Sequence, residues 1–384
     1  MNTRERIMAV LNYQPYDRLP IVNFGYWVET LEKWAAEGHI TEEQARSSSD
    51  GNEIDYAIGD KLGFDFNWAT TFGWTSRLFP PIERRVVEER PDGTRVVLDE
   101  NGAYIIEKTG IVSIPTEVDH ILKSRKEWDE FFKPRLQFTM ERITGSRVCI
   151  DGRILPFEQG GLDLLKSQDR STPYGLYCGS LVGVIRDWLG LVNMSYLMAD
   201  NPALFDEMIE VVAELCYQGV EAILETGARF EFGHFWEDMC YKGGPLISPR
   251  VFTQKAGPHY RRITDLMKSH GVTLVSLDCD GKIDKLVSIW LENGVNIMFP
   301  IEVGTWNASI RPWREQYGPE LRGVGGVRKA VFALDYAAVE AEIERLRPLV
   351  ELGGYIPCPD HRIPSDAKWE NIQYYCERLR KLYG

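Results

Sequence analysis

The stretch HGVTLVSLDCDG (270–281) contains the pattern that decides the fold. It follows a helix-like segment, and Gly271 suits the left-handed conformation that closes a helix. A short apolar run comes next and ends in two aspartates, Asp278 and Asp280, on either side of Cys279. The order is therefore helix, glycine, buried strand, and polar side chains where the strand ends.

The same order recurs through the second half of the chain. The apolar segments that follow helix-ending glycines are ARFEFGHFWED (228–238), VTLVSLDCDG (272–281), VNIMFPIEV (295–303) and YIPCPDH (355–361). Helices that alternate with buried apolar strands indicate a parallel sheet covered by helices. Because about eight strands can be counted, we predict an α/β fold in which they close into a (β/α)₈ TIM barrel.

The predicted barrel forms a single domain over residues 1–384 with one small insertion. Residues 83–109 alternate in a strand-like manner and are interrupted at Asp92-Gly93 and Asn101-Gly102. Both dipeptides favour tight hairpin turns. We therefore expect an antiparallel β-hairpin insertion there.

Composition narrows the class of protein. Of the 384 residues, 44% are apolar, and no stretch reaches the roughly 18 uninterrupted apolar residues that a membrane span needs. The net charge of −13 argues against binding to nucleic acid or to an anionic membrane, since such proteins usually carry a basic surface. Seven scattered cysteines without a CxxC pair, and an N-terminus unlike a signal peptide, indicate reduced thiols. A cytoplasmic enzyme is expected.

Strand alternation directs the two aspartates of 270–281 towards the inside of the barrel. Side chains along a strand point alternately to its two faces, so Leu277 and Cys279 share the face that helices cover. Asp278 and Asp280 then share the opposite face. Because chemistry in such barrels takes place at the carboxyl ends of the strands, both carboxylates are expected at the mouth.

The next repeats add further ligand-type side chains at corresponding places, Glu302 and His361. Several carboxylates in one space repel one another and raise their pKa values, and a divalent cation would relieve that repulsion. Asp278, Asp280, Glu302 and His361 are therefore predicted to bind a divalent metal, with zinc as the first candidate. The alternative is that the aspartates cap the helix that begins near Lys282.

A second group of candidates follows the preceding strand. His234, Glu237 and Asp238 end the segment 228–238, and together with His361 they are predicted to serve substrate binding or acid–base catalysis. A histidine in such a place can also be an ordinary core residue. Aromatic residues near other strand ends suit an apolar pocket for an aromatic ligand: Tyr26, Trp27, Trp68, Trp74, Trp236 and Trp306.

Four segments resemble the uroporphyrinogen decarboxylase superfamily. They are TRERIMAVLNYQPYDRLP (3–20), PLISPRVF (245–252), GVNIMFPIEV (294–303) and GGYIPCPDHRIPSDAKWENI (353–372). The resemblance implies a (β/α)₈ barrel with its site at the carboxyl ends of the strands. It also implies either the decarboxylase activity or that of the corrinoid-linked methyltransferases, and it is consistent with a homodimer.

Two departures from the family pattern favour the methyltransferase branch. The decarboxylase carries arginine after its first strand, whereas NFGYWVETLEKWAAEG (23–38) has none and is acidic, which suits a polyanionic substrate poorly. The zinc-binding His-x-Cys-Gly segment of the methyltransferases, anchored on Gly281, places its ligands on Asp278 and Asp280. The later family ligands fall on Glu302 and His361.

The family's sulfur ligands are replaced here by oxygen ligands, which disfavours methylation of a thiol. The resemblance implies instead O-demethylation or a related reaction, in which a methyl group passes from a small donor, such as a methoxylated aromatic compound, to cobalamin on a corrinoid protein. A metal would assist the departure of the methyl-bearing atom. The alternative is decarboxylation of a small or tetrapyrrole carboxylate.

Overall fold

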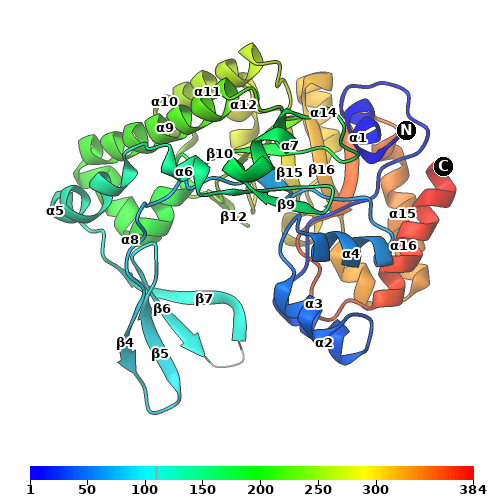
Figure 1. Ribbon diagram of the computed structural model, residues 1–384, viewed down its shortest axis with the longest axis horizontal. Coiled ribbons are helices and arrows are strands. Elements are labelled where there is room, and N and C mark those ends of the chain that lie inside the picture. The colour runs from blue at the N-terminus through cyan, green and yellow to red at the C-terminus, as the bar shows by residue number, and fades with distance from the viewer. Residues whose placement is uncertain (109–110) are drawn as a thin grey trace.

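The computed structural model describes residues 1–108 and 111–384, and its centre is a parallel sheet surrounded by helices (Figure 1). Seven strands pair in the order β17-β16-β15-β14-β11-β10-β3, and all of these pairs are parallel. The strands are β3 (Thr71–Phe72), β10 (Gly175–Gly179), β11 (Phe232–Trp236), β14 (Val275–Asp278), β15 (Ile297–Ile301), β16 (Arg322–Val327) and β17 (Tyr355–Pro359).

Two further short strands close this sheet into a barrel. β2 (Phe66–Asn67) lies just before β3 and pairs in parallel with β1 (Val22–Asn23). Beyond β1, Tyr26 forms a parallel bridge with Ile363, which follows β17. Because β2 and β3 share one position, the described strands fill eight positions of a closed ring. The predicted TIM barrel is confirmed.

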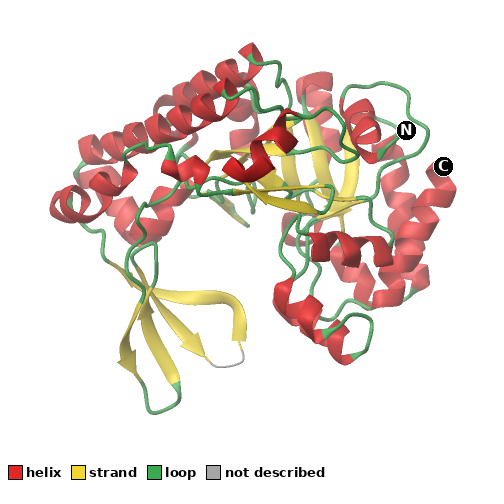
Figure 2. Cartoon of the chain, viewed as in Figure 1, coloured by secondary structure: helices red, strands yellow, loops and turns green. Residues whose placement is uncertain are grey.

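Helices cover the outside of the barrel, as the two colours of Figure 2 show. Around the strands lie α8 (Gly183–Asp200), α9 (Pro202–Glu225), α10 (Pro249–Lys255), α11 (Gly257–Ser269), α12 (Asp284–Glu292), α13 (Val303–Trp306), α14 (Ile310–Tyr317), α15 (Tyr336–Val350) and α16 (Trp369–Tyr383). The N-terminal part contributes α1 (Thr3–Leu11), α2 (Val28–Ala36), α3 (Glu42–Ser47) and α4 (Glu53–Leu62). Among the described residues, no helix is both long enough and apolar enough to cross a membrane.

The insertion after β3 is a four-stranded antiparallel sheet that projects from the barrel below α8 (Figure 1). Its strands are β4 (Arg85–Glu89), β5 (Thr94–Leu98), β6 (Ala103–Lys108) and β7 (Ile111–His120). It extends beyond the predicted hairpin at 83–109, whose last residue lies outside the described residues. Pro115 makes residues 111–120 a poor strand candidate by sequence, but β7 is an edge strand, where a missing N–H is tolerated.

Shorter elements complete the chain. Between the insertion and β10 lie α5 (Arg125–Glu127), η1 (Trp128–Phe132), η2 (Lys133–Leu136), α6 (Glu141–Thr144), β8 (Arg147–Ile150), β9 (Arg153–Pro156), η3 (Phe157–Gly161) and α7 (Leu162–Lys166). The others are β12 (Cys240–Tyr241), β13 (Gly244–Pro245), η4 (Gly318–Glu320) and η5 (Lys329–Ala333).

Aromatic rings fill the interior of the barrel below the carboxyl ends of its strands. The Trp68 ring stacks on Phe232, with ring centroids 4.8 Å apart. Its indole N–H donates across the interior to the Ser276 hydroxyl over 3.1 Å. Trp68 and Ser276 are both fully buried, so this contact occupies the barrel between its second and fifth strands.

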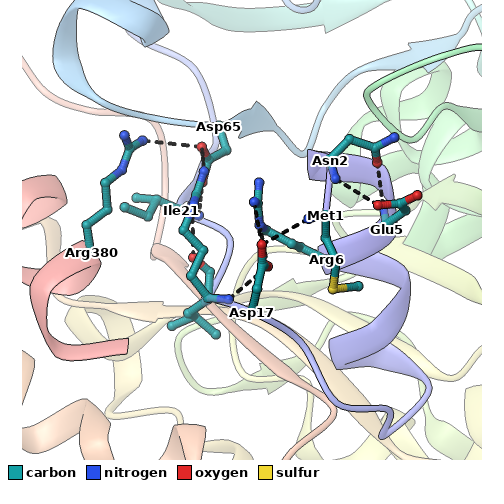
Figure 3. A network of polar contacts seen from close by, with 10 residues as sticks. Met1, Asn2, Glu5, Arg6, Asp17, Ile21, Asp65 and Arg380 are labelled. Carbon is teal, nitrogen blue, oxygen red and sulfur yellow. Dashed lines mark hydrogen bonds and ion pairs between the residues drawn. The ribbon is translucent and has the colours of Figure 1, made fainter. Parts of the chain in front are cut away.

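Ion pairs fasten the N-terminus to the barrel (Figure 3). Asp17 accepts hydrogen bonds from the Arg6 guanidinium over 2.7 and 2.8 Å and pairs with the N-terminal ammonium group at 3.0 Å. Asp65 accepts from the Ile21 backbone N–H over 2.9 Å and pairs with Arg380 of α16 at 3.2 Å. The two chain ends are thereby held against the first barrel strands.

Arg142 connects the base of the insertion, and its replacement tests that role. It is 1% exposed, and its guanidinium and Nε donate to the backbone carbonyls of Thr75, Arg77, Arg135 and Gln137. Arg142→Met removes four donors and leaves the carbonyls of Thr75, Arg77 and Gln137 unpaired, so we expect the free energy of unfolding measured in urea to fall by about 3 kcal/mol.

The exposed Arg147 provides the matched control. Arg147→Met is expected to change the free energy of unfolding by less than about 0.5 kcal/mol. Equal losses in the two variants would show that the four carbonyl contacts of Arg142 do not stabilise the insertion.

Candidate functional site

Three aspartates meet at the carboxyl ends of β11 and β14. Asp238, Asp278 and Asp280, called here the acidic cluster, each offer a carboxylate oxygen, and these oxygens lie within 4.8 Å of one another. The Asp280 backbone N–H donates to Asp238 Oδ1 over 2.9 Å, and the Glu237 N–H donates to the Asp278 carbonyl over 2.9 Å. Side chains predicted for two separate roles therefore form one group.

The backbone at Asp238 is unusual and is held in place by α8. Its φ angle is +45°, a region that non-glycine residues seldom adopt. The Arg186 guanidinium donates to the Asp238 carbonyl and pairs with Asp187 at 2.7 Å. The first turn of α8 thus supports the conformation that directs Asp238 towards the other two aspartates.

Two carboxylates of the cluster, those of Asp238 and Asp278, hold protons unusually strongly. Burial, and secondarily the nearby Asp280, raise the pKa of Asp238 to about 7. Burial, with the charges of Asp238 and Asp280, raises the pKa of Asp278 well above its usual value. Like charges this close are relieved by bound protons or by a divalent cation. Asp280 Oδ1 is also buried and has no hydrogen-bond partner among the described residues.

Arg362 gives the cluster only part of the compensating charge that it needs. Its positive charge opposes the rise in the pKa of Asp278. The same guanidinium is already engaged by Asp50, with Nη1 and Oδ1 3.0 Å apart, and it lies over the Phe24 ring at 5.5 Å. Arg362 therefore balances the negative charge of the cluster only in part.

His361 contacts the cluster as a hydrogen-bond donor. Its Nδ1 accepts from the Arg362 backbone N–H over 2.8 Å, and its Nε2 lies 3.2 Å from Asp280 Oδ2. Because Nδ1 accepts, a neutral ring carries its hydrogen on Nε2 and donates it to Asp280. The ring stacks on Trp27, with centroids 5.3 Å apart and planes 16° apart. A metal would require the Nε2 lone pair, which this arrangement does not provide.

Glu302 borders the cluster without joining it. Its carboxylate accepts hydrogen bonds from the Gly281 backbone N–H over 2.5 Å and from the Thr305 hydroxyl over 2.7 Å. Burial and the neighbouring Asp280 raise its pKa. Of the four predicted metal ligands, the geometry thus groups Asp278 and Asp280 with Asp238, whereas Glu302 and His361 are hydrogen-bonding neighbours.

Glu237 is bound to the start of α8 rather than open to a substrate. It is fully buried, and its carboxylate accepts from the backbone N–H groups of Leu181, Val182 and Gly183 over 2.7, 3.0 and 2.6 Å. The Tyr260 hydroxyl also donates to it. Unpaired N–H groups at a helix start favour a negative charge. Although Glu237 was predicted as catalytic, its contacts are those of a residue that fastens α8 to β11.

His234 lies lower in the barrel. It is 6% exposed, and its ring is 6.0 Å from that of Phe299. Its Nδ1 is buried and has no hydrogen-bond partner in the described part of the chain. Burial lowers its pKa to about 4, so the imidazole is neutral at physiological pH.

Sequence reasoning missed Arg362 and Asp50. Arg362 directly follows His361 in a polar segment at a strand end, and this position was a usable signal. Asp50 lies in the polar stretch before α4, where no pattern distinguishes it from its neighbours. Its role comes from tertiary contacts, with Arg362 and with the Asn67 amide.

One comparison with a solved structure supports the fold, and a second likeness is weaker. A methyltransferase from Methanosarcina mazei is 15% identical, the match covers 100% of both chains, and the TM-score is 0.60. A protein assigned as a vitamin-B12-independent methionine synthase from Listeria monocytogenes is 12% identical over 96% of this chain and 98% of that chain, with a TM-score of 0.41. No curated protein matches the sequence.

A family model provides the assignment. The model described as uroporphyrinogen decarboxylase (URO-D) matches residues 186–382, a range that contains the acidic cluster, Glu302 and His361. This range is more than half of the 384-residue chain. The protein therefore belongs to the uroporphyrinogen decarboxylase family.

Proposed function

We propose that the protein is a corrinoid-dependent methyltransferase, which moves a methyl group from a small methoxylated donor to a corrinoid carried by a partner protein. The observation that carries the proposal is the acidic cluster, with its adjoining His361 donor, at the carboxyl ends of the barrel strands. The likeness to a methyltransferase is one of fold, so the chemistry has to be argued from the site.

The acidic cluster suits a divalent cation. Asp238, Asp278 and Asp280 would hold it, because their carboxylates crowd together, the pKa values of Asp238 and Asp278 are raised, and Arg362 balances the negative charge only in part. All three ligands are hard oxygens, which fit Mg²⁺ or Mn²⁺ as well as Zn²⁺. When bound, such a cation supplies Lewis acidity that polarises the oxygen of a methoxy group.

The transfer exchanges one bond for another. The bond between the methyl carbon and the donor oxygen breaks, and both of its electrons stay on the oxygen. The methyl carbon accepts an electron pair from cobalt(I) of the corrinoid substrate, and the freed oxygen takes up a proton from solvent. In this reaction His361 fixes the position of Asp280 through its Nε2–H, and Glu237 and Arg186 hold Asp238 through α8.

Decarboxylation of a polyanion fits the site less well. The acidic cluster repels carboxylates, and the two neighbouring cations, Arg362 and Arg186, are already paired with Asp50 and Asp187. A decarboxylase would release carbon dioxide from its substrate without any corrinoid, and this outcome separates the two reactions.

Metal binding is expected and can be measured without turnover. Calorimetric titration of metal-free protein with MnCl₂ or ZnCl₂ should reveal one ion per chain. Asp278→Asn/Asp280→Asn should weaken binding at least about 100-fold, because it removes two of the three charged ligands.

The control removes the same charge elsewhere. Asp163 and Asp169 are polar residues at or near α7 and outside the cluster, so Asp163→Asn/Asp169→Asn should bind the ion as the unmodified protein does. Full stoichiometry and unchanged affinity in the Asp278/Asp280 variant would show that the ion binds elsewhere.

Methyl transfer is tested with the whole chain, cob(I)alamin and a methoxybenzene. The absorption spectrum should change from that of cob(I)alamin to that of methylcobalamin, with one equivalent of phenol formed per methyl group transferred. The Asp278→Asn/Asp280→Asn variant should react at least about 100-fold more slowly, since it loses several kcal/mol of electrostatic stabilisation. No spectral change with ether, amine or thiol donors would contradict the proposed function.

A further inference from the structure

Two polar side chains inside the barrel lack partners. Tyr177 on β10 and His234 on β11 are neighbours in register. His234 Nδ1 is buried without a hydrogen-bond partner, and among the described residues the Tyr177 hydroxyl has none either. The Tyr177 hydroxyl, on a partly exposed side chain, and the second ring nitrogen of His234, which is not enclosed, are therefore available to a further partner.

Both side chains face the barrel interior. The residue after Tyr177, Cys178, directs its sulfur outwards to Met267 of α11, 3.4 Å away. The residue after His234, Phe235, packs its ring against Tyr260 of α11, with centroids 5.0 Å apart. Because side chains alternate along a strand, Tyr177 and His234 point the opposite way, into the barrel.

Both side chains keep some contact with solvent. Tyr177 is partly exposed, and His234 keeps 6% of its surface accessible, whereas Ser276, the next inward residue around the ring, keeps none. Phe232 and Phe299 flank the imidazole, with ring centroids 6.4 and 6.0 Å away. The pair therefore presents two polar groups among aromatic rings.

The two groups present hydrogens rather than charges. Burial raises the pKa of Tyr177, so its hydroxyl stays protonated, and burial keeps the His234 imidazole neutral. An orphaned buried N–H is rarer than an orphaned acceptor, which assigns the lone pair to the enclosed Nδ1 and the hydrogen to Nε2. Tyr177 and His234 then both act as donors, and their natural partner is an oxygen acceptor.

Tyr177 and His234 lie deeper in the barrel than the acidic cluster. His234 pairs in register with Ser276, and two residues further on Trp236 pairs with Asp278. Two residues along a strand correspond to about 6.6 Å. An aromatic molecule held by the pair therefore extends along the barrel towards the cluster.

We infer that Tyr177 and His234 form a binding subsite for an oxygen substituent of the methyl donor, located on its aromatic ring opposite the methoxy group. The inference rests on the proposed function for the identity of the ligand. With the oxygen held deep in the barrel, the methoxy group faces the mouth, where a protein-bound corrinoid has to approach. A ring without that oxygen leaves two donors unpaired, which selects against it.

Binding of two probes tests the subsite. Unmodified protein is titrated in a calorimeter with 4-methoxyphenol and with methoxybenzene, which lacks the second oxygen. We expect 4-methoxyphenol to bind at least about tenfold more tightly, because two hydrogen bonds are gained. Tyr177→Phe and His234→Leu should each reduce this preference to less than about threefold, because each removes one of the two donors.

The exposed Tyr196 provides a matched control, and Tyr196→Phe should keep the full preference. Equal binding of the two probes to the unmodified protein, binding of neither, or a preference that survives in both variants would overturn the inference. The measurement needs no corrinoid. A preference that depends on Tyr177 and His234 without any methyl transfer would leave the subsite standing and refute only the proposed function.

Discussion

The contact between Glu237 and the start of α8 is the interaction on which the site depends. A buried carboxylate at the end of β11 gathers three consecutive backbone N–H groups and the Tyr260 hydroxyl. It thereby joins β11 to α8, the helix that follows the neighbouring strand β10. Arg186 in the first turn of that helix returns to hold the carbonyl of Asp238. A carboxylate bound to a helix start thus fixes the orientation of the residue next to it.

The acidic cluster illustrates how a barrel concentrates charge. Parallel strands end at the same rim, so acidic residues that are far apart in sequence meet there. The resulting repulsion is visible in the raised pKa values of Asp238 and Asp278. The protein stabilises this arrangement only in part, through Arg362 and the hydrogen bond from His361. Such a partly balanced group is ready to accept a positive charge.

Local patterns in the sequence were sufficient for the barrel and for two members of the cluster. Helix-ending glycines and apolar strands recur with the period of the fold, and strand alternation directs Asp278 and Asp280 inwards. The membership of Asp238 was not foreseeable, because it depends on a left-handed backbone and on a distant arginine. The donor role of His361 was equally hidden, since a backbone N–H decides which ring nitrogen carries the hydrogen. The predicted insertion was too short, because Pro115 conceals the edge strand β7 in the sequence.

The hydrogen bond from Trp68 to Ser276 closes the barrel interior below the site. The indole spans the interior from the second strand to the fifth, and both residues are sealed from solvent. Anything bound above them enters and leaves through the same rim. Under the proposed reaction, a methyl acceptor that covers the rim also blocks the way out. The demethylated product would then have to wait for the acceptor to depart, which imposes an order of release on the catalytic cycle.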